Sequence, residues 1–147
     1  MSLLTKAGEL EWLYLKKEKQ DEYQAQVLRE FRDEIERGNV NFDEQTEEGQ
    51  SCLLFFSARG YDQLIRLFVE NKANCNLVTS QTSGRWSPLM YGCLYGNVKV
   101  VIELLKGLAN PFLENTSVFF HIFIQLFLLQ IPSSYFFGPY HLISFQK

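Results

Sequence analysis

The sequence has few cysteines and histidines, and this scarcity excludes several kinds of site. Its three cysteines, Cys52, Cys75 and Cys93, are an odd number without a Cys-x-x-Cys pair, so no disulfide framework is expected. Each lies in an apolar run and is predicted to be a buried thiol in a reducing compartment. The two histidines, His121 and His141, have no cysteine or second histidine at zinc-ligand spacing, so no metal site is predicted.

Phosphate-binding and catalytic motifs are also missing. No Gly-x-Gly-x-x-Gly or Walker-type loop occurs, and both histidines lie far along the chain from every cysteine. A Ser–His–Asp or Cys–His arrangement is not expected, so the sequence predicts no enzyme and no cofactor. The net charge of −3 leaves no basic stripe for phosphate contacts, and nucleic acid is not an expected partner.

Charge is distributed unevenly along the chain. Residues 1–50 hold seven Lys or Arg against thirteen Asp or Glu, whereas residues 51–115 hold six against four. After these, the only charged side chain is that of Lys147. The pattern indicates three segments with different roles. Because the first residues contain no continuous apolar stretch, we expect no signal peptide and a cytoplasmic location.

The middle of the chain contains an internal repeat. Residues 51–60 align with residues 87–96 at an offset of 36, with Ser, Leu and Gly at matching positions. Apolar residues follow at i, i+3 and i+4 in both units, and Gly60 and Gly96 can each end a helix. Each unit is therefore predicted to form two short helices and a loop. The predicted helices cover 52–59 and 62–70 in the first unit, and 89–95 and 98–106 in the second.

These residues resemble the ankyrin repeat. Its pattern Thr-Pro-Leu-His, then Gly-His, then Val-Val-x-Leu-Leu-Leu is matched or conservatively substituted in the second unit by Ser87-Pro88-Leu89, by Gly96-Asn97, and by Val100, Val101, Leu104 and Leu105. The resemblance implies an all-α fold, a short helical solenoid of helix-turn-helix pairs joined by hairpin loops. Two ankyrin-like repeats are expected, at about 48–80 and 84–115.

The two units depart from the family pattern. The family's buried histidine is replaced by Leu54 and Met90, which removes a hydrogen bond typically worth about 1 kcal/mol, so soft repeats are expected. The offset of 36 exceeds the family's usual ~33 residues and places about three extra residues in the hairpin loop over 78–85.

Two segments flank the repeats. Residues 20–37 have an apolar stripe at every fourth position and are predicted to form an amphipathic helix that covers the first repeat. The predicted organisation is an acidic N-terminal helical cap over 1–42, the repeats over 43–115 and a hydrophobic, aromatic-rich tail over 116–147.

The tail admits three interpretations. It holds nine of the aromatic residues, and its apolar run from Val118 to Ile131 is shorter than the ~20 residues of a bilayer span. In the first interpretation the tail is a truncation or splice product that replaces further repeats. In the second it is an apolar helix that caps the last repeat, and in the third it is a segment that contacts a membrane. The loss of charge at a repeat boundary favours truncation, and the length does not favour membrane contact.

The resemblance implies a protein that binds another protein. The predicted function is a non-enzymatic scaffold or adaptor; the alternatives are a membrane-associated ankyrin protein tethered by its tail, or a truncated isoform of a larger scaffold. Ankyrin stacks contact partners with hairpin tips and with the exposed side of the first helices, where Trp, Tyr and Arg are effective anchors. Alternatively, Tyr91 and Leu94 pack against a further repeat. The positions carried over are Arg59, Gln81, Arg85, Trp86, Tyr91 and Tyr95.

Overall fold

The structure is a computed structural model that describes residues 20–38, 40–117 and 127–132. Each helix predicted from the spacing is present, with bounds that agree to within one residue. Most of the predicted tail and the first 19 residues of the predicted cap lie outside the described residues. The helices are α2 (Gln20–Glu36), α3 (Cys52–Arg59), α4 (Asp62–Glu70), α5 (Pro88–Leu94) and α6 (Val98–Lys106).

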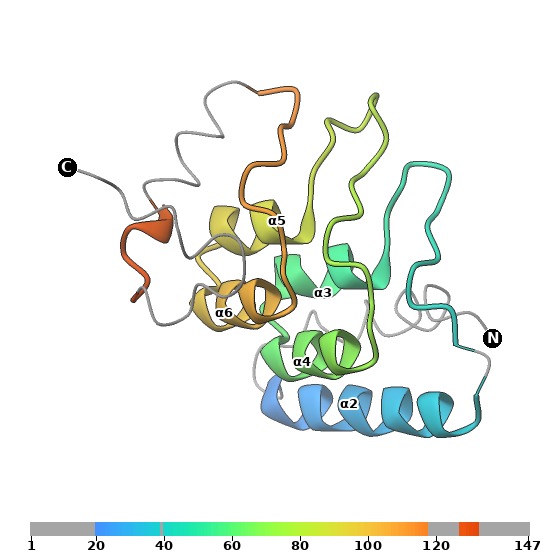
Figure 1. Ribbon diagram of the computed structural model, residues 1–147. Helices are drawn as coiled ribbons and strands as arrows, with labels where there is room; N and C mark the ends of the chain where they lie inside the picture. Colours follow the sequence, from blue (N-terminus) through green and yellow to red (C-terminus); the bar gives the residue numbers. More distant parts are fainter. Residues whose placement is uncertain (1–19, 39, 118–126, 133–147) are drawn as a thin grey trace.

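The four short helices form two layers (Figure 1). Helices α3 and α5 lie side by side in one layer, and α4 and α6 lie side by side in the other. The loops over 40–51, 71–87 and 107–117 all extend to the same side of the molecule. Helix α2 lies along α4, and its Phe31 contacts both α4 and α3. This all-helical arrangement of the described residues agrees with the short ankyrin-type solenoid expected from the repeat.

Local side chains set where the inner helices begin and end. Ser51 starts α3 by accepting a hydrogen bond from the main-chain N–H of Leu54 at 3.3 Å. Ser87 starts α5 in the same way, with the N–H of Met90 at 3.2 Å. Gly60 ends α3 with a φ of +78°, a left-handed conformation that other residues adopt only with strain. The helix starts and stops expected from the sequence are confirmed.

A single apolar core joins the two layers to α2. The Phe31 ring of α2 is fully buried and lies 5.4 Å, between centroids, from Phe56 of α3 and also 5.4 Å from Phe68 of α4. Burying one large apolar side chain contributes roughly 1.5–3 kcal/mol. Helix α2 therefore stabilises the first helix pair by covering its outer end.

The side chains of Asp43 and Asn76 connect the bases of successive loops. The main-chain N–H of Asn74 donates to Asp43 Oδ1 at 2.7 Å, and that of Asn110 donates to Asn76 Oδ1 at 2.6 Å. Asn76 Nδ2 also donates to the carbonyl of Leu108 at 3.4 Å. These bonds hold each loop in a fixed register against the next one.

The extra residues of the middle loop form a closed turn at its tip. The N–H groups of Ser83 and Arg85 both donate to the Ser80 carbonyl at 3.1 Å. Below the tip, Thr79 and Trp86 exchange two bonds, from Thr79 N to Trp86 O at 2.9 Å and from Trp86 N to Thr79 Oγ1 at 2.8 Å. The insertion predicted over 78–85 is therefore ordered by its own hydrogen bonds.

A short part of the tail packs against the second helix pair, beside α5 and α6 (Figure 1). Leu128 and Ile131 are only 2% and 6% exposed and belong to the common core, whereas Leu129 between them is 54% exposed. Within the described ranges, no helix has the length and apolarity that crossing a membrane requires.

All three cysteines are free and buried, which confirms the prediction of core thiols. Burial raises the pKa of Cys52 to about 12, that of Cys75 to about 11 and that of Cys93 to about 12. A thiol with such a pKa stays protonated near neutral pH and is a poor nucleophile.

Candidate protein-interaction surface

Three aromatic rings stack along α5 and the residue that leads into it. The ring centroids of Trp86 and Tyr91 are 5.4 Å apart with an interplanar angle of 23°, and those of Tyr91 and Tyr95 are 6.3 Å apart at 13°. Tyr91 and Tyr95 meet because residues four apart lie on one face of a helix. The Tyr95 side chain at the end of this row is 59% exposed. These three residues are called the aromatic column.

The equivalent positions on α3 carry a cation stacked on a ring. Phe55 and Arg59 correspond to Tyr91 and Tyr95 at the offset of 36. The Arg59 guanidinium carbon lies 3.5 Å from the centroid of the Phe55 ring, and Nη1 donates to the Phe55 carbonyl at 3.2 Å. A guanidinium held over an aromatic face keeps its charge while losing side-chain freedom. We call this the Arg59–Phe55 pair.

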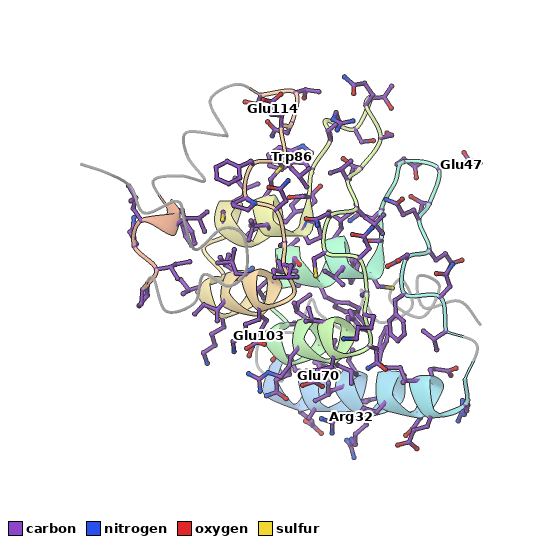
Figure 2. All side chains as sticks on the ribbon, in the orientation of Figure 1. Arg32, Glu47, Glu70, Trp86, Glu103 and Glu114 are labelled. Atoms are coloured by element: carbon purple, nitrogen blue, oxygen red, sulfur yellow. The ribbon has the colours of Figure 1, made fainter. Side chains whose placement is uncertain are left out.

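The middle loop positions Trp86 at the start of the column. Gly84 has a φ of +94°, and a Cβ built on it would lie 2.7 Å from Trp86 Nε1, so only glycine fits beside the indole. The N–H of Thr116 in the last loop donates to the Gly84 carbonyl at 3.1 Å. Figure 2 shows Trp86 where the loops approach α5. The column is therefore fixed at one end by two neighbouring loops.

The structure brings together four of the six residues expected at a partner surface. Trp86, Tyr91 and Tyr95 form one stack, and Arg59 lies on the adjacent helix. The other two, residues 81 and 85, are exposed in the closed turn at the loop tip instead. The helix surface and the loop tip are thus separate parts of the surface expected from the sequence.

This helix surface is aromatic and carries one charge. Arg59 is the only charged residue in α3 and α5. Partial burial, with a smaller contribution from nearby Tyr95, raises the pKa of the Tyr91 phenol. Tyr91 therefore stays neutral near physiological pH and keeps its hydroxyl as a hydrogen-bond donor.

Two sets of polar contacts between the units could not be predicted from local sequence patterns. Asn97 Nδ2 donates to the carbonyl of Ser57 at 2.9 Å and to that of Ala58 at 3.3 Å. In the other layer, Glu103 Oε1 accepts bonds from Arg66 and Lys106, both at 3.0 Å, although its side chain is only 8% exposed.

The charge state of Glu103 follows from these contacts. Burial alone would raise the pKa of its carboxyl group, but the hydrogen bonds from Arg66 and Lys106 outweigh that effect and lower the pKa. Its partner on α4 is 37 residues away along the chain, so only the repeat register brings the two together.

Other features of the described residues do not indicate a metal site or a catalytic site. No group of three or more metal-ligating side chains comes together in the part of the chain that the structure describes. A shallow pocket of about 370 Å³ mixes two cations and two carboxylates without a nucleophile. Figure 2 shows two of its lining residues, Arg32 on α2 and Glu70 on α4. It is lined by Arg32, Asp62, Gln63, Arg66, Leu67 and Glu70.

Comparison with known families identifies the class of protein. The family described as ankyrin repeats (3 copies) matches residues 19–115, well over half of the chain. The chain belongs to the ankyrin-repeat family. The match begins at residue 19 and therefore includes α2. The family model describes three repeat copies, whereas the spacing in the sequence predicts two repeats and a cap. A comparison with curated proteins gave no match. Ankyrin repeats are generally protein–protein interaction modules and are not an enzyme fold.

Proposed function

We propose that this chain is a cytoplasmic adaptor that binds a partner protein on the aromatic column and the adjacent Arg59–Phe55 pair. The observation that carries this proposal is the three-ring stack, which ends in a tyrosine that is 59% exposed. Trp, Tyr and Arg are the residue types most enriched among those that dominate binding energy. Here Arg59 and Tyr91 lie on two adjacent helices, and Trp86 lies in the loop that leads into the second of them.

The rigidity of this surface supports the same proposal. Ordering a flexible side chain on binding costs about 0.5–1.5 kcal/mol, and that cost lowers affinity. The stacked rings and the guanidinium held over Phe55 have already lost that freedom in the free protein. The cytoplasmic location is supported by three buried thiols that remain unpaired, as is usual in a reducing compartment.

Proximity labelling in cells tests the proposal. The intact protein is compared with Tyr95→Ala and with the double variant Trp86→Ala/Tyr95→Ala, after circular dichroism has shown that both fold. Leu129→Ala is the matched control, because Leu129 is also an exposed apolar residue, at 54%, but is not part of the column. We expect the column variants to lose a group of labelled proteins that the control retains. Identical labelling by all four proteins would exclude the column as a binding surface.

A further inference from the structure

The last helix pair of the stack carries most of the exposed apolar surface of the described residues. Figure 1 shows α5 and α6 at one end of the stack and α2 at the other. Six large apolar side chains of the described residues are at least 37% exposed, namely Leu94, Tyr95, Val98, Leu108, Phe112 and Leu129. All six lie in the last helix pair, in the loops that adjoin it or in the tail segment beside it. Because the end units of repeat stacks normally need a polar outer face for solubility, we expect this end to be covered in solution.

The repeat register shows which side of α6 faces away from the first unit. Arg66 of α4 donates to Glu103 of α6 at 3.0 Å, so position 66 lies toward the next unit. The offset of 36 makes Ile102 its equivalent, and makes Val98 the equivalent of Asp62, which lies one turn before Arg66. Val98 and Ile102 therefore lie on the side of α6 that faces away from the first unit. The first unit carries charged residues at both positions.

The turn between α5 and α6 adds a third apolar residue to this side. The carbonyl of Ala58 accepts a bond from Asn97 of the second unit at 3.3 Å, so the end of α3 borders the next unit. Leu94 is the equivalent of Ala58 and is 43% exposed. The side chains of Leu94, Val98 and Ile102 are together called the open face.

This end of the stack lacks the polar groups that join the first unit to the second. At the loop bases, Asn76 accepts a bond from the main-chain N–H of Asn110 at 2.6 Å, but the equivalent of Asn76 is Phe112, whose side chain has no acceptor. On the helices, Ile102 takes the place of Arg66, which makes the inter-unit ion pair. A further ankyrin unit would find neither link, so the open face fits an apolar partner surface better than another repeat of this kind.

We propose that the open face of one chain packs against the open face of a second copy, which gives a dimer with two-fold symmetry. In such a contact the same surface occurs on both sides, so an apolar face meets an apolar face. The alternative contact is between the open face and α2 of another copy. It would place apolar side chains against exposed charges such as Arg32, Asp33 and Glu36.

The charges near the open face allow this contact. Lys106, one turn beyond Ile102 on α6, is paired with Glu103 at 3.0 Å and therefore brings little net charge. The dimer also joins two helix pairs from each chain around one apolar interface, and repeat proteins gain stability from each interface between units. The contact uses neither Arg59 nor Trp86, so it does not depend on the proposed adaptor function.

Sedimentation of the full chain at a series of concentrations tests the proposal. From about 1 to about 100 µM, a range that includes weak dimers, we expect the mean mass to rise from that of one chain toward that of two and to fall again on dilution. The mass of one chain at every concentration would overturn the dimer. Growth beyond two chains would overturn it as well, because a two-fold contact closes on itself.

Two variants place first-unit residues at the open face. Val98→Asp and Ile102→Arg introduce the residues that α4 carries at the equivalent positions, so both are expected to fold, which circular dichroism checks. Each substitution occurs twice in a two-fold contact and brings like charges together. We expect each variant to raise the dissociation constant of the dimer by about tenfold or more. An unchanged dissociation constant in either folded variant would exclude the open face as the contact.

Lys99→Glu is the matched control, because it reverses a charge on the same helix but on its other side. Gln63, the equivalent of Lys99, lines a small pocket with Gln24 and Leu28 of α2, so this position lies toward the preceding unit. The dissociation constant of Lys99→Glu should stay within about twofold of that of the natural protein. A loss of the dimer as large as that in Ile102→Arg would show a general effect of charge and would also overturn the proposal.

Discussion

The Asn97 side chain bridges the two helix pairs, and its replacement by alanine measures what that bridge contributes. Its amide group reaches the last turn of α3, with bonds of 2.9 and 3.3 Å to the carbonyls of Ser57 and Ala58. It also packs on Gly60, where an added Cβ would lie 2.9 Å from Asn97 Oδ1. Asn97 precedes α6 but makes no side-chain cap bond within it, so Asn97→Ala removes the inter-unit contacts without removing a helix cap.

The size of the effect follows from those two bonds. A hydrogen bond within a protein contributes about 0.5–1.5 kcal/mol, and the longer of the two belongs at the low end. We therefore expect Asn97→Ala to lower the free energy of unfolding by about 1–2 kcal/mol. For a repeat domain of about 100 residues, each kcal/mol of lost stability lowers the midpoint of thermal unfolding by about 4–8 °C. The midpoint should therefore fall by roughly 5–15 °C.

Urea unfolding followed by circular dichroism provides the assay. The midpoint should shift to lower urea while the slope of the transition stays unchanged, because the substitution exposes little new surface. Lys99→Ala serves as the control on the same helix, since an exposed side chain should change stability by no more than about 0.5 kcal/mol. If Asn97→Ala unfolds at the same urea concentration as the control, the amide does not hold the units together and the reasoning is wrong.

Three further predictions concern the core, the buried carboxylate and the thiols. Leu128→Ala should lower the free energy of unfolding by about 2–5 kcal/mol in thermal melts, whereas Leu129→Ala should be nearly neutral, because only Leu128 is buried. Glu103 has a lowered pKa, so its ionised form stabilises the fold above the ordinary pKa of 4.5 and this stability is lost as pH falls through the lowered value. Urea unfolding at a series of pH values should thus show a larger loss on acidification for the natural protein than for Glu103→Gln, and parallel curves would contradict the assignment. The cysteines should react with a thiol reagent at pH 8 only after urea unfolds the chain, and rapid labelling of the folded protein would show that they are accessible.

The helices could be predicted from sequence because their limits depend on neighbours within a few residues. Ser87 accepts a bond from a main-chain N–H three residues ahead, and Gly60 adopts a left-handed conformation without strain. The 36-residue offset likewise placed Arg59 and Tyr95 at equivalent positions before any packing was known. Such local rules do not determine how many repeats the chain contains. The family match over residues 19–115 includes α2, whereas the spacing of the apolar residues in α2 alone assigns that helix to a cap.

The contacts between units were decided only by the tertiary structure. From sequence, Asn97 is a turn residue beside Gly96, yet its amide bonds to a carbonyl 40 positions away. Gly107 follows a helix end, but a Cβ there would lie 2.8 Å from Cys75 Sγ, so close packing of the units is what requires glycine. Spacing along a chain shows which positions share a helix face. The direction and distance of a side chain from another unit depend on how closely the two helix pairs approach, and that follows from the packing of the whole core.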